Sequence, residues 1–348
     1  MRDVLADIDR WRAEGRPVAI ATVVETWGSS PRRVGAKMAL TEGHRMAGSV
    51  SGGCVEGAVI EAGDAVLKSG RPRLLHFGVA DETAWAVGLS CGGSIDVFVE
   101  PLEADFYDAL RDRLAAEAPL AVATVLSGPE PAVGRKLIVS EDGSARGSIG
   151  SGLDEAVVAA ARAALAQGRS QRSPLPEPVR AEAFVEVVRP SPTLVVVGGV
   201  HIAVALTTIA KAMGYHTVVV DPRRPFGSGE RFPHADRVVN AWPDEGIGEV
   251  GLTSDSAVAV LTHDPKVDDP ALRAALPSPA FYVGALGSKA TQAKRRQRLL
   301  DAGLTEEQIG RLRAPIGLDL GGRSPEEIAL AVMAQIVAVR YGRGDALR

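Results

Sequence analysis

A cysteine inside a glycine-rich segment is the clearest chemical feature of this sequence. The ten residues from Gly48 to Gly57 hold four glycines, one cysteine and one carboxylate, between a strand-like and a helix-like stretch. Glycine costs roughly 0.5–1 kcal/mol inside regular structure, so the cluster indicates a loop that needs positive φ or room for a ligand against bare backbone. Cys54 stands where a helix should begin, and N–H groups at a helix N-terminus favour an anion, a thiolate included. We therefore expect Gly52, Gly53 and Cys54 to contact a ligand, with ligand contact or sulfur handling as the candidate role of Cys54.

A second cysteine and a polar loop offer further ligand contacts. Cys91 is followed by two glycines, whereas Cys54 is preceded by two. The spacing of 37 residues, with no Cys-x-x-Cys pair and no nearby histidine, excludes a structural zinc site. A buried, inert thiol is the alternative for each cysteine. In the polar loop before the glycine cluster, Arg32 and Arg33 are candidate contacts for an anion. Ser29 and Ser30 of the same loop are further candidate ligand contacts.

An internal repeat organises the first half of the chain. The stretch from Pro17 to Val23 reappears as Pro119 to Val125, and each copy continues as a predicted β-hairpin followed by a helix. Six further residues recur 99 positions later: Gly35, Lys37, Gly48, Ser49, Gly53 and Glu56 correspond to Gly134, Lys136, Gly147, Ser148, Gly152 and Glu155. The second copy lacks three residues, and the missing length falls in the polar loop.

The two copies separate scaffold from candidate function. The second copy has Ser151 in place of Gly52 and Leu153 in place of Cys54. We interpret the shared positions as scaffold and the differences as function. Glu56 is a candidate ligand contact, but its recurrence favours a structural capping role.

The second half of the chain follows the pattern of a dinucleotide-binding unit. The apolar stretch from Leu194 to Val197 runs into Gly198, Gly199, Val200 and His201, which open a predicted helix, and Asp221 ends the next strand. In that layout Gly198, Gly199 and His201 surround a pyrophosphate, and Asp221 binds a ribose hydroxyl. Val200 occupies the second glycine position, where its branched side chain should hinder the usual approach.

Another strand-to-helix turn lies at Gly284 to Ser288. Gly287 and Ser288 could hold a phosphate in the same crevice, and a plain turn with Ser288 as the helix cap is the alternative. The basic residues that follow, Lys289 to Arg298, are interpreted mainly as a solvated helix face.

Length and composition set the broad class. The length of 348 residues favours two domains, and a composition of 46% hydrophobic and 24% charged residues is that of a soluble protein. The net charge of -4 argues against a nucleic-acid partner. Acids near the N-terminus and the lack of a long apolar run predict a cytoplasmic protein without a membrane segment. We expect an N-terminal α+β domain with the duplicated unit at 1–190 and a C-terminal Rossmann-like parallel α/β domain at 191–348.

The sequence resembles the XdhC/CoxI family of xanthine dehydrogenase accessory proteins. The resemblance rests on Gly28 to Arg32, Gly48 to Gly57, Ser90 to Gly93, Ala285 to Ser288 and Ala314 to Asp319, and it runs through nearly the whole chain. Where the family usually reads Gly-Ala-Gly-His, this sequence has Gly-Gly-Val-His.

The resemblance implies a maturation chaperone with a C-terminal Rossmann domain. Such a protein binds the molybdenum cofactor (molybdopterin) while a cysteine desulfurase supports replacement of an oxo by a sulfido ligand. It then passes the cofactor to a xanthine dehydrogenase-type molybdenum hydroxylase. A nucleotide in the Rossmann domain is the second candidate ligand, and a homodimer is expected.

Two other classes of function are also consistent with the sequence. An NAD(P)-dependent oxidoreductase is the alternative that the pattern from Gly198 to Asp221 favours, and a docking protein without a ligand is the other. A non-catalytic accessory factor is preferred over an enzyme. The sequence leaves open whether Cys54 ligates molybdenum or relays sulfur.

Overall fold

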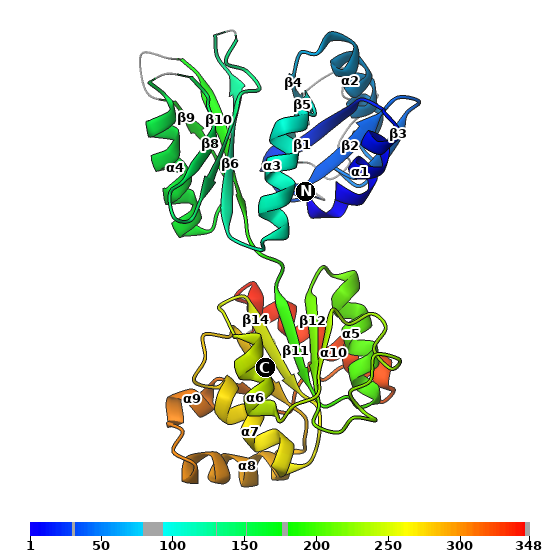
Figure 1. The fold of residues 1–348 in the computed structure, drawn as a ribbon, viewed down its shortest axis with the longest axis vertical. Helices are drawn as coiled ribbons and strands as arrows, with labels where there is room; N and C mark the ends of the chain where they lie inside the picture. Colours follow the sequence, from blue (N-terminus) through cyan, green and yellow to red (C-terminus); the bar gives the residue numbers. More distant parts are fainter. Residues whose placement is uncertain (30–31, 79–92, 130, 151, 176–179, 345–348) are drawn as a thin grey trace. The chain divides into compact units, whose positions relative to one another are not determined.

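The chain divides into two compact units, Met1–Pro190 and Ser191–Arg348. The structure is a computed structural model, and it describes residues 1–29, 32–78, 93–129, 131–150, 152–175 and 180–344 (Figure 1). None of the helices it describes has the length and apolar character needed to cross a bilayer.

The first unit opens with a five-stranded antiparallel sheet. In sheet order its strands are β3 (Arg45–Gly48), β2 (Lys37–Thr41), β1 (Val18–Trp27), β5 (Ser94–Pro101) and β4 (Arg73–Phe77). Helix α2 (Glu56–Ser69) packs Val59 and Val66 onto one face, against alanine and valine side chains of β1 and β5. A short 3-10 helix, η1 (Arg2–Val4), leads into α1 (Leu5–Ala13), which packs on the other face.

The second half of this unit repeats the same architecture. After α3 (Ala104–Ala115), the sheet order is β8 (Ala145–Gly147), β7 (Lys136–Ser140), β6 (Leu120–Ser127), β10 (Glu182–Val188) and β9 (Gln171–Pro174), covered by α4 (Asp154–Gln167). Helices α2 and α4 both have 14 residues, and each ends at a left-handed glycine, Gly70 or Gly168. The predicted duplication is therefore confirmed.

The structure corrects the alignment of the two copies at the helix start. Gly147 follows Gly48 by 99 positions, but α4 begins 98 positions after α2, because the second loop is one residue shorter. Glu56 therefore corresponds to Asp154, and the predicted pairing with Glu155 is wrong by one residue. The residue before α4, Leu153, corresponds to Val55, so the pairing of Leu153 with Cys54 is wrong as well.

Two reciprocal ion pairs join the two copies. Lys37 on β2 of the first copy pairs with Glu186 on β10 of the second at 2.8 Å. Lys136 on β7 of the second copy pairs with Glu100 on β5 of the first at 2.9 Å. All four side chains are nearly or fully buried, and an apolar cluster of valine, leucine and phenylalanine side chains from both copies lies beside them. The repeated lysines thus join the copies as scaffold residues.

The second unit is a six-stranded parallel sheet with helices on both faces. Its strands, in sheet order, are β13 (Arg237–Val239), β12 (His216–Val220), β11 (Thr193–Val197), β14 (Ser256–Val260), β15 (Tyr282–Ala285) and β16 (Leu312–Arg313). Its helices are α5 (His201–Ala212), α6 (Pro243–Val250), α7 (Pro265–Ala275), α8 (Lys289–Asp301), α9 (Glu306–Gly310) and α10 (Pro325–Arg340). This strand order is that of the Rossmann fold, as predicted.

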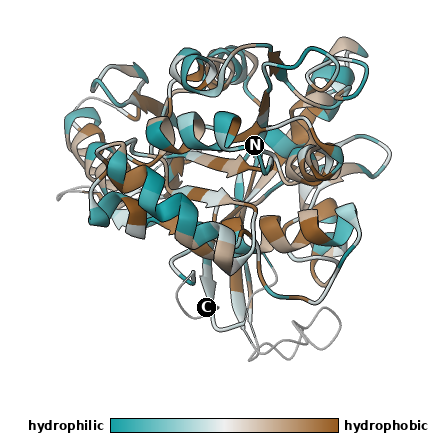
Figure 2. Ribbon diagram, turned by 90° about the horizontal axis from the view of Figure 1, so that it is seen from below, coloured by the Kyte–Doolittle hydropathy of each residue, from teal (hydrophilic) through white to brown (hydrophobic). Residues whose placement is uncertain are grey.

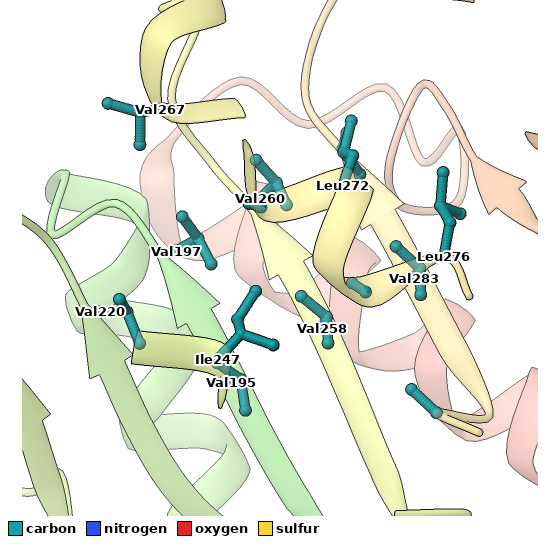
Figure 3. Packing of buried hydrophobic residues seen from close by; sticks show 14 of the residues in the cluster. Val195, Val197, Val220, Ile247, Val258, Val260, Val267, Leu272, Leu276 and Val283 are labelled. Atoms are coloured by element: carbon teal, nitrogen blue, oxygen red, sulfur yellow. The ribbon is translucent and has the colours of Figure 1, made fainter. Parts of the chain in front are cut away.

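Valine-rich strands form the centre of the second unit. Helices α6, α7 and α8 cover one face of the sheet, where Val195, Val258 and Leu272 pack together (Figure 3). Helices α5 and α10 cover the other face. Hydrophobic strands and helices of mixed character are visible in Figure 2. Because both faces are buried, the strands read as continuous apolar runs in the sequence.

Removing one partner of a buried ion pair should destabilise the first unit. We predict that Lys37→Met lowers the free energy of unfolding by about 3–5 kcal/mol, because the Glu186 carboxylate is left buried without a cation. The double variant Lys37→Met/Glu186→Leu should recover most of that loss in urea unfolding. Equal stability of the single and double variants would contradict a paired role for these residues.

Candidate functional site

The glycine-rich loop of the first copy folds around the carboxylate of Glu56. That carboxylate accepts six hydrogen bonds: from the hydroxyls of Ser49 and Ser51 and from the amides of Val50, Ser51, Gly52 and Gly53. The amide distances run from 2.8 to 3.2 Å. The loop amides, Gly52 and Gly53 included, therefore point at an internal anion. Within the described residues, Glu56 holds the loop in one conformation, and both of its carboxylate oxygens are engaged by hydrogen bonds from the loop.

The ionisation of Glu56 is strongly favoured by these bonds. Burial opposes the charged form, but the hydrogen bonds from Ser51 and Ser49 and from the loop amides outweigh it and lower the pKa of Glu56 to about 2. A carboxylate that accepts several backbone N–H groups is expected to behave in this way. The loop is therefore held by a full negative charge at neutral pH.

The second copy has a weaker version of this arrangement. Asp154 accepts hydrogen bonds from Ser148 Oγ at 2.6 Å and from the amides of Ile149 and Gly150 at 2.7 and 3.2 Å. The first loop has one more residue between its Gly-Ser entry and its helix, and Cys54 lies in that longer segment. The structural difference between the copies is thus concentrated where the cysteine stands.

Cys54 is half-buried and lies two residues before α2 begins. It packs against the apolar cluster under α2, so part of its surface is fixed by the core. An added Cβ at Gly53 or Gly57 would meet nothing within 4 Å, so the backbone on both sides of the cysteine faces open space. Among the residues that the structure describes, no group of three or more metal-ligating side chains occurs. Cys54 therefore offers a single thiol on an open, fixed loop.

Two other motifs from the sequence are joined to this loop. Arg32 Nε donates to the carbonyl of Ser49 at 3.1 Å, so the cationic loop contacts the glycine loop directly. A Cβ at Gly93 would lie 2.5 Å from the carbonyl oxygen of Ser29, so Gly93 passes close against that exposed residue. Ser30 and Cys91 lie outside the described residues, and their predicted contacts stay predictions.

Trp27 is a candidate contact that sequence reasoning missed. Strand β1 ends at Trp27, which pairs with Ser94, and its side chain is 72% exposed. The second copy lacks this extension, because β6 ends at Ser127, the counterpart of Glu25. The length difference between the two copies could have indicated this residue, because the residues that the second copy lacks fall beside Trp27. An exposed indole next to Ser29 offers a flat surface on which a heterocycle can stack.

In the second unit, the residues of the dinucleotide pattern bind one another. Asp221 is fully buried, and its carboxylate accepts from the Gly199 amide at 2.8 Å and from the guanidinium of Arg223 at 2.9 and 2.8 Å. Burial alone would raise the pKa of Asp221, but the bonds from Arg223 and from the amides outweigh it, so the pKa lies below its ordinary value. The predicted ribose acceptor is thus engaged by the chain itself.

A segment of the same unit covers the Gly198–Gly199 turn. A Cβ at Gly199 would lie 2.1 Å from the carbonyl oxygen of Phe226, and one at Gly198 would lie 2.3 Å from the Thr262 side chain. Val200, the predicted obstacle, precedes α5 and packs partly into the core, whereas His201 is exposed at the first helical position. The backbone at Phe226 therefore lies where a pyrophosphate would approach.

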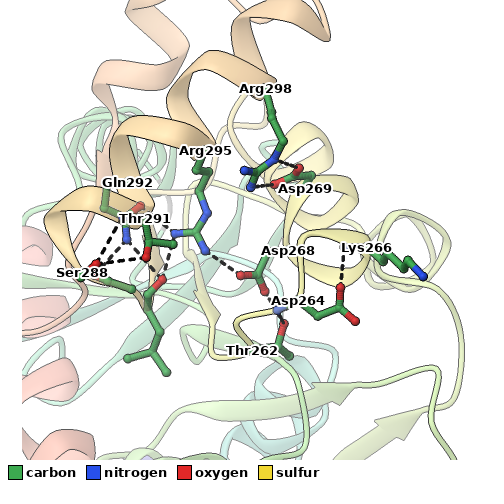
Figure 4. A network of polar contacts seen from close by, with 12 residues as sticks. Thr262, Asp264, Lys266, Asp268, Asp269, Ser288, Thr291, Gln292, Arg295 and Arg298 are labelled. Atoms are coloured by element: carbon green, nitrogen blue, oxygen red, sulfur yellow. Dashed lines mark hydrogen bonds and ion pairs between the residues drawn. The ribbon is translucent and has the colours of Figure 1, made fainter.

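The turn at Gly287 and Ser288 is fixed by a buried polar network (Figure 4). Ser288 caps α8 by accepting from the Thr291 amide at 3.2 Å. Arg295, on the same helix, donates to the carbonyl of Leu286 at 2.9 Å and to Asp268 at 2.6 Å, and it is 1% exposed. The predicted solvated face is therefore wrong for Arg295, whose side chain binds the turn from inside.

Removal of the charge of Glu56 should loosen the loop in a pH-dependent way. Because its pKa falls from 4.5 to about 2 on folding, the carboxylate contributes stability above pH 4.5 that is lost as the pH falls through 2. We expect Glu56→Gln to lower the free energy of unfolding at pH 7 by about 1.5–3 kcal/mol, because charge-assisted hydrogen bonds are lost. Urea unfolding at several pH values should show the difference from the parent shrinking below pH 4.5.

The neighbouring carboxylate of the second copy provides the matched control. Glu155 is exposed, so Glu155→Gln should change the free energy of unfolding by no more than about 0.5 kcal/mol. A loss as large for Glu155→Gln as for Glu56→Gln would contradict the corrected alignment of the copies.

Comparison with known proteins places the chain in a family. A model described as the XdhC and CoxI family matches residues 11–78 and 102–175, and the XdhC Rossmann domain matches residues 194–336. The first two stretches fall on the two copies of the repeat.

Two relatives and one solved structure match along most of their own length. A protein of Bacillus subtilis described as a probable xanthine dehydrogenase component is 27% identical, with 96% of each chain covered. A molybdenum cofactor insertion chaperone of Escherichia coli, PaoD, is 28% identical over 94% of this chain and 84% of its own. The crystal structure of a xanthine dehydrogenase from Bacillus halodurans superposes with a TM-score of 0.79 at 25% identity, covering 97% of this chain and 96% of that one. The chain therefore belongs to the XdhC and CoxI family.

Proposed function

We propose that this protein is a cytoplasmic chaperone that carries the molybdenum cofactor to a xanthine dehydrogenase-type hydroxylase. In this role it holds the cofactor while a cysteine desulfurase supports its sulfuration, and it then supports insertion into the enzyme. It acts as a homodimer and as an accessory factor without a reaction of its own. One observation carries the proposal: Cys54 lies half-exposed on a loop that Glu56 fixes, at the place where the two copies differ.

The relatives support this role. One is a molybdenum cofactor insertion chaperone and another is a probable xanthine dehydrogenase component, and both match nearly the whole chain. The match extends over both units, so the role does not rest on the Rossmann-like fold alone.

The chemistry of the site fits the proposed cargo. The cargo carries a pterin, a phosphate and an oxidised metal centre, which call for a flat apolar surface, a cation and a soft or anionic ligand. Trp27 offers the surface, Arg32 the guanidinium and Cys54 the thiol. The open backbone at Gly53 and Gly57 lets a large ligand approach the sulfur. We place Cys54 at the metal end of the cargo, a position that serves both ligation and sulfur relay.

The rival function, an NAD(P)-dependent oxidoreductase, lacks this support. A dinucleotide would have to displace Arg223 from Asp221 and the backbone of Phe226 from the Gly199 turn. Both contacts are internal to the second unit. They favour a Rossmann architecture that no longer binds a dinucleotide in the usual crevice.

Replacement of Cys54 should impair cofactor handling without unfolding the protein. We expect Cys54→Ala to reduce molybdenum retention about tenfold or more, which corresponds to the loss of about 1.4 kcal/mol or more of binding free energy. Metal analysis of the purified variant and sulfuration of the client hydroxylase are the measurements. The matched control, Asp154→Asn, loosens the loop of the second copy and should retain molybdenum as the parent does. If Cys54→Ala matured the client fully, a chemical role for Cys54 would be excluded.

The covered glycine turn predicts that nicotinamide dinucleotides do not bind. Titration of the full chain with NADH and NADPH, followed by fluorescence, should show no saturable binding up to about 1 mM, where an interaction of about 4 kcal/mol would already be visible. Saturable binding in the micromolar range, abolished by Asp221→Ala, would favour the oxidoreductase instead.

A further inference from the structure

A large cavity lies in the second unit, away from the Gly198 turn. Its volume is about 1100 Å³, and it opens at the carboxyl ends of β15 and β16. Ligand sites in proteins measure roughly 300–1,000 Å³. In open α/β sheets, ligands bind outside the carboxyl ends of the strands. The cavity therefore has the size of a ligand site and lies at the edge of the sheet where ligands bind. It lies at β15 and β16, not at the covered Gly198–Gly199 turn that follows β11.

One wall of the cavity is a segment that the proposed function leaves without a role. Residues 314–319 run from β16 along the cavity, and the side chain of Gln335 on α10 fixes them. Gln335 Oε1 accepts from the amide of Gly317 at 3.0 Å and from the hydroxyl of Tyr282 at 2.6 Å, and its Nε2 donates to the carbonyl of Gly317 at 3.2 Å. Gln335 thus fixes the conformation of this wall, and its side-chain oxygen and nitrogen are both engaged in hydrogen bonds within the protein.

The turn at Leu286, which also borders the cavity, is fixed by hydrogen bonds from side chains of α8. Gln292, on the first turn of α8, donates to the carbonyls of Leu286 and Gly287 at 3.2 Å and accepts from Arg295 at 2.7 Å. The guanidinium of Arg295 is buried against Asp268, so the turn that borders the cavity is tied to the core (Figure 4). A cavity with two fixed walls can select a rigid ligand.

The lining combines apolar surface with three arginines and three carboxylates, those of Glu306, Asp319 and Glu327. Its apolar members are Leu286, Ile309, Leu312, Ile316, Leu318 and Ile328. Three arginines, Arg296, Arg313 and Arg323, lie on the walls, and Arg296 pairs with Glu306. The Glu327 carboxylate accepts from the backbone amides of Arg323 and Ser324, so it caps α10.

These groups indicate the chemistry of the ligand. A guanidinium binds phosphate through two parallel hydrogen bonds and also stacks on flat aromatic rings. Aliphatic walls cover the faces of such rings at low cost. Leu320, which is 56% exposed and flanks the cavity next to Gly321, provides further apolar surface at its rim.

We propose that this cavity binds a flat heteroaromatic compound that carries a phosphate, either a nucleotide or a pterin phosphate. Arg323 and Arg313 bind the phosphate, and the aliphatic wall from Ile316 to Leu318 covers the ring. The inference goes beyond the proposed function, because it concerns the second unit and holds for a nucleotide even if the first unit carries no molybdenum.

The test is calorimetric titration of the full chain with four probes: AMP, neopterin monophosphate, adenosine and inorganic phosphate. At least one phosphorylated heterocycle should bind with a Kd below about 100 µM, and adenosine and inorganic phosphate should bind at least about tenfold more weakly. The stronger of the two phosphorylated probes identifies the source of the ligand.

Two variants and a control locate the binding. Arg323→Glu, on an exposed loop, should weaken binding of the stronger probe at least tenfold, and Leu318→Trp should narrow the cavity at the proposed ring site and weaken it as well. Arg273→Glu reverses an exposed arginine of the same unit that does not line the cavity, and it should bind as the parent does. The proposal is overturned if neither phosphorylated probe saturates by about 1 mM, or if inorganic phosphate binds equally well. Binding that both cavity variants leave unchanged would also overturn it.

Discussion

The loop that carries Cys54 depends on one carboxylate. Glycine-rich segments have many conformations open to them, and fixing one of these costs conformational free energy. Here hydrogen bonds from two serines and four successive amides to Glu56 hold a single conformation. The carboxylate takes the place that an external anion would fill, so the loop amides serve structure and leave the thiol and the open backbone beside it as the groups that face a ligand.

Duplication explains how such a loop can be maintained. The two copies share a sheet order, a helix of equal length and the reciprocal lysine–glutamate pairs that join them. The second copy keeps a shorter loop around Asp154 and has neither the cysteine nor the extended end of β1. Both copies thus form the scaffold, and only the first carries the candidate ligand contacts Trp27, Arg32 and Cys54.

The fold could be predicted from the sequence, because the repeat, the apolar strands and the glycine turns are local patterns. The site could be predicted only in part. A one-residue difference in loop length is invisible where glycine and serine recur, so the sequence alone pairs Glu56 with Glu155, whereas its counterpart in the structure is Asp154. Long-range contacts leave no local signal either: neither the backbone of Phe226 over Gly199 nor the burial of Arg295 follows from the helix or turn that contains it.

The metal and pterin content of the full chain decides whether this protein carries the molybdenum cofactor. The protein would be isolated without oxygen from cells that make the cofactor, and molybdenum and oxidised pterin would be measured against protein. We expect molybdenum and pterin in equimolar amounts with the chain, and we expect both to be lost when Cys54 is replaced. Protein that carries neither molybdenum nor pterin, although it still matures the client hydroxylase, would contradict this expectation.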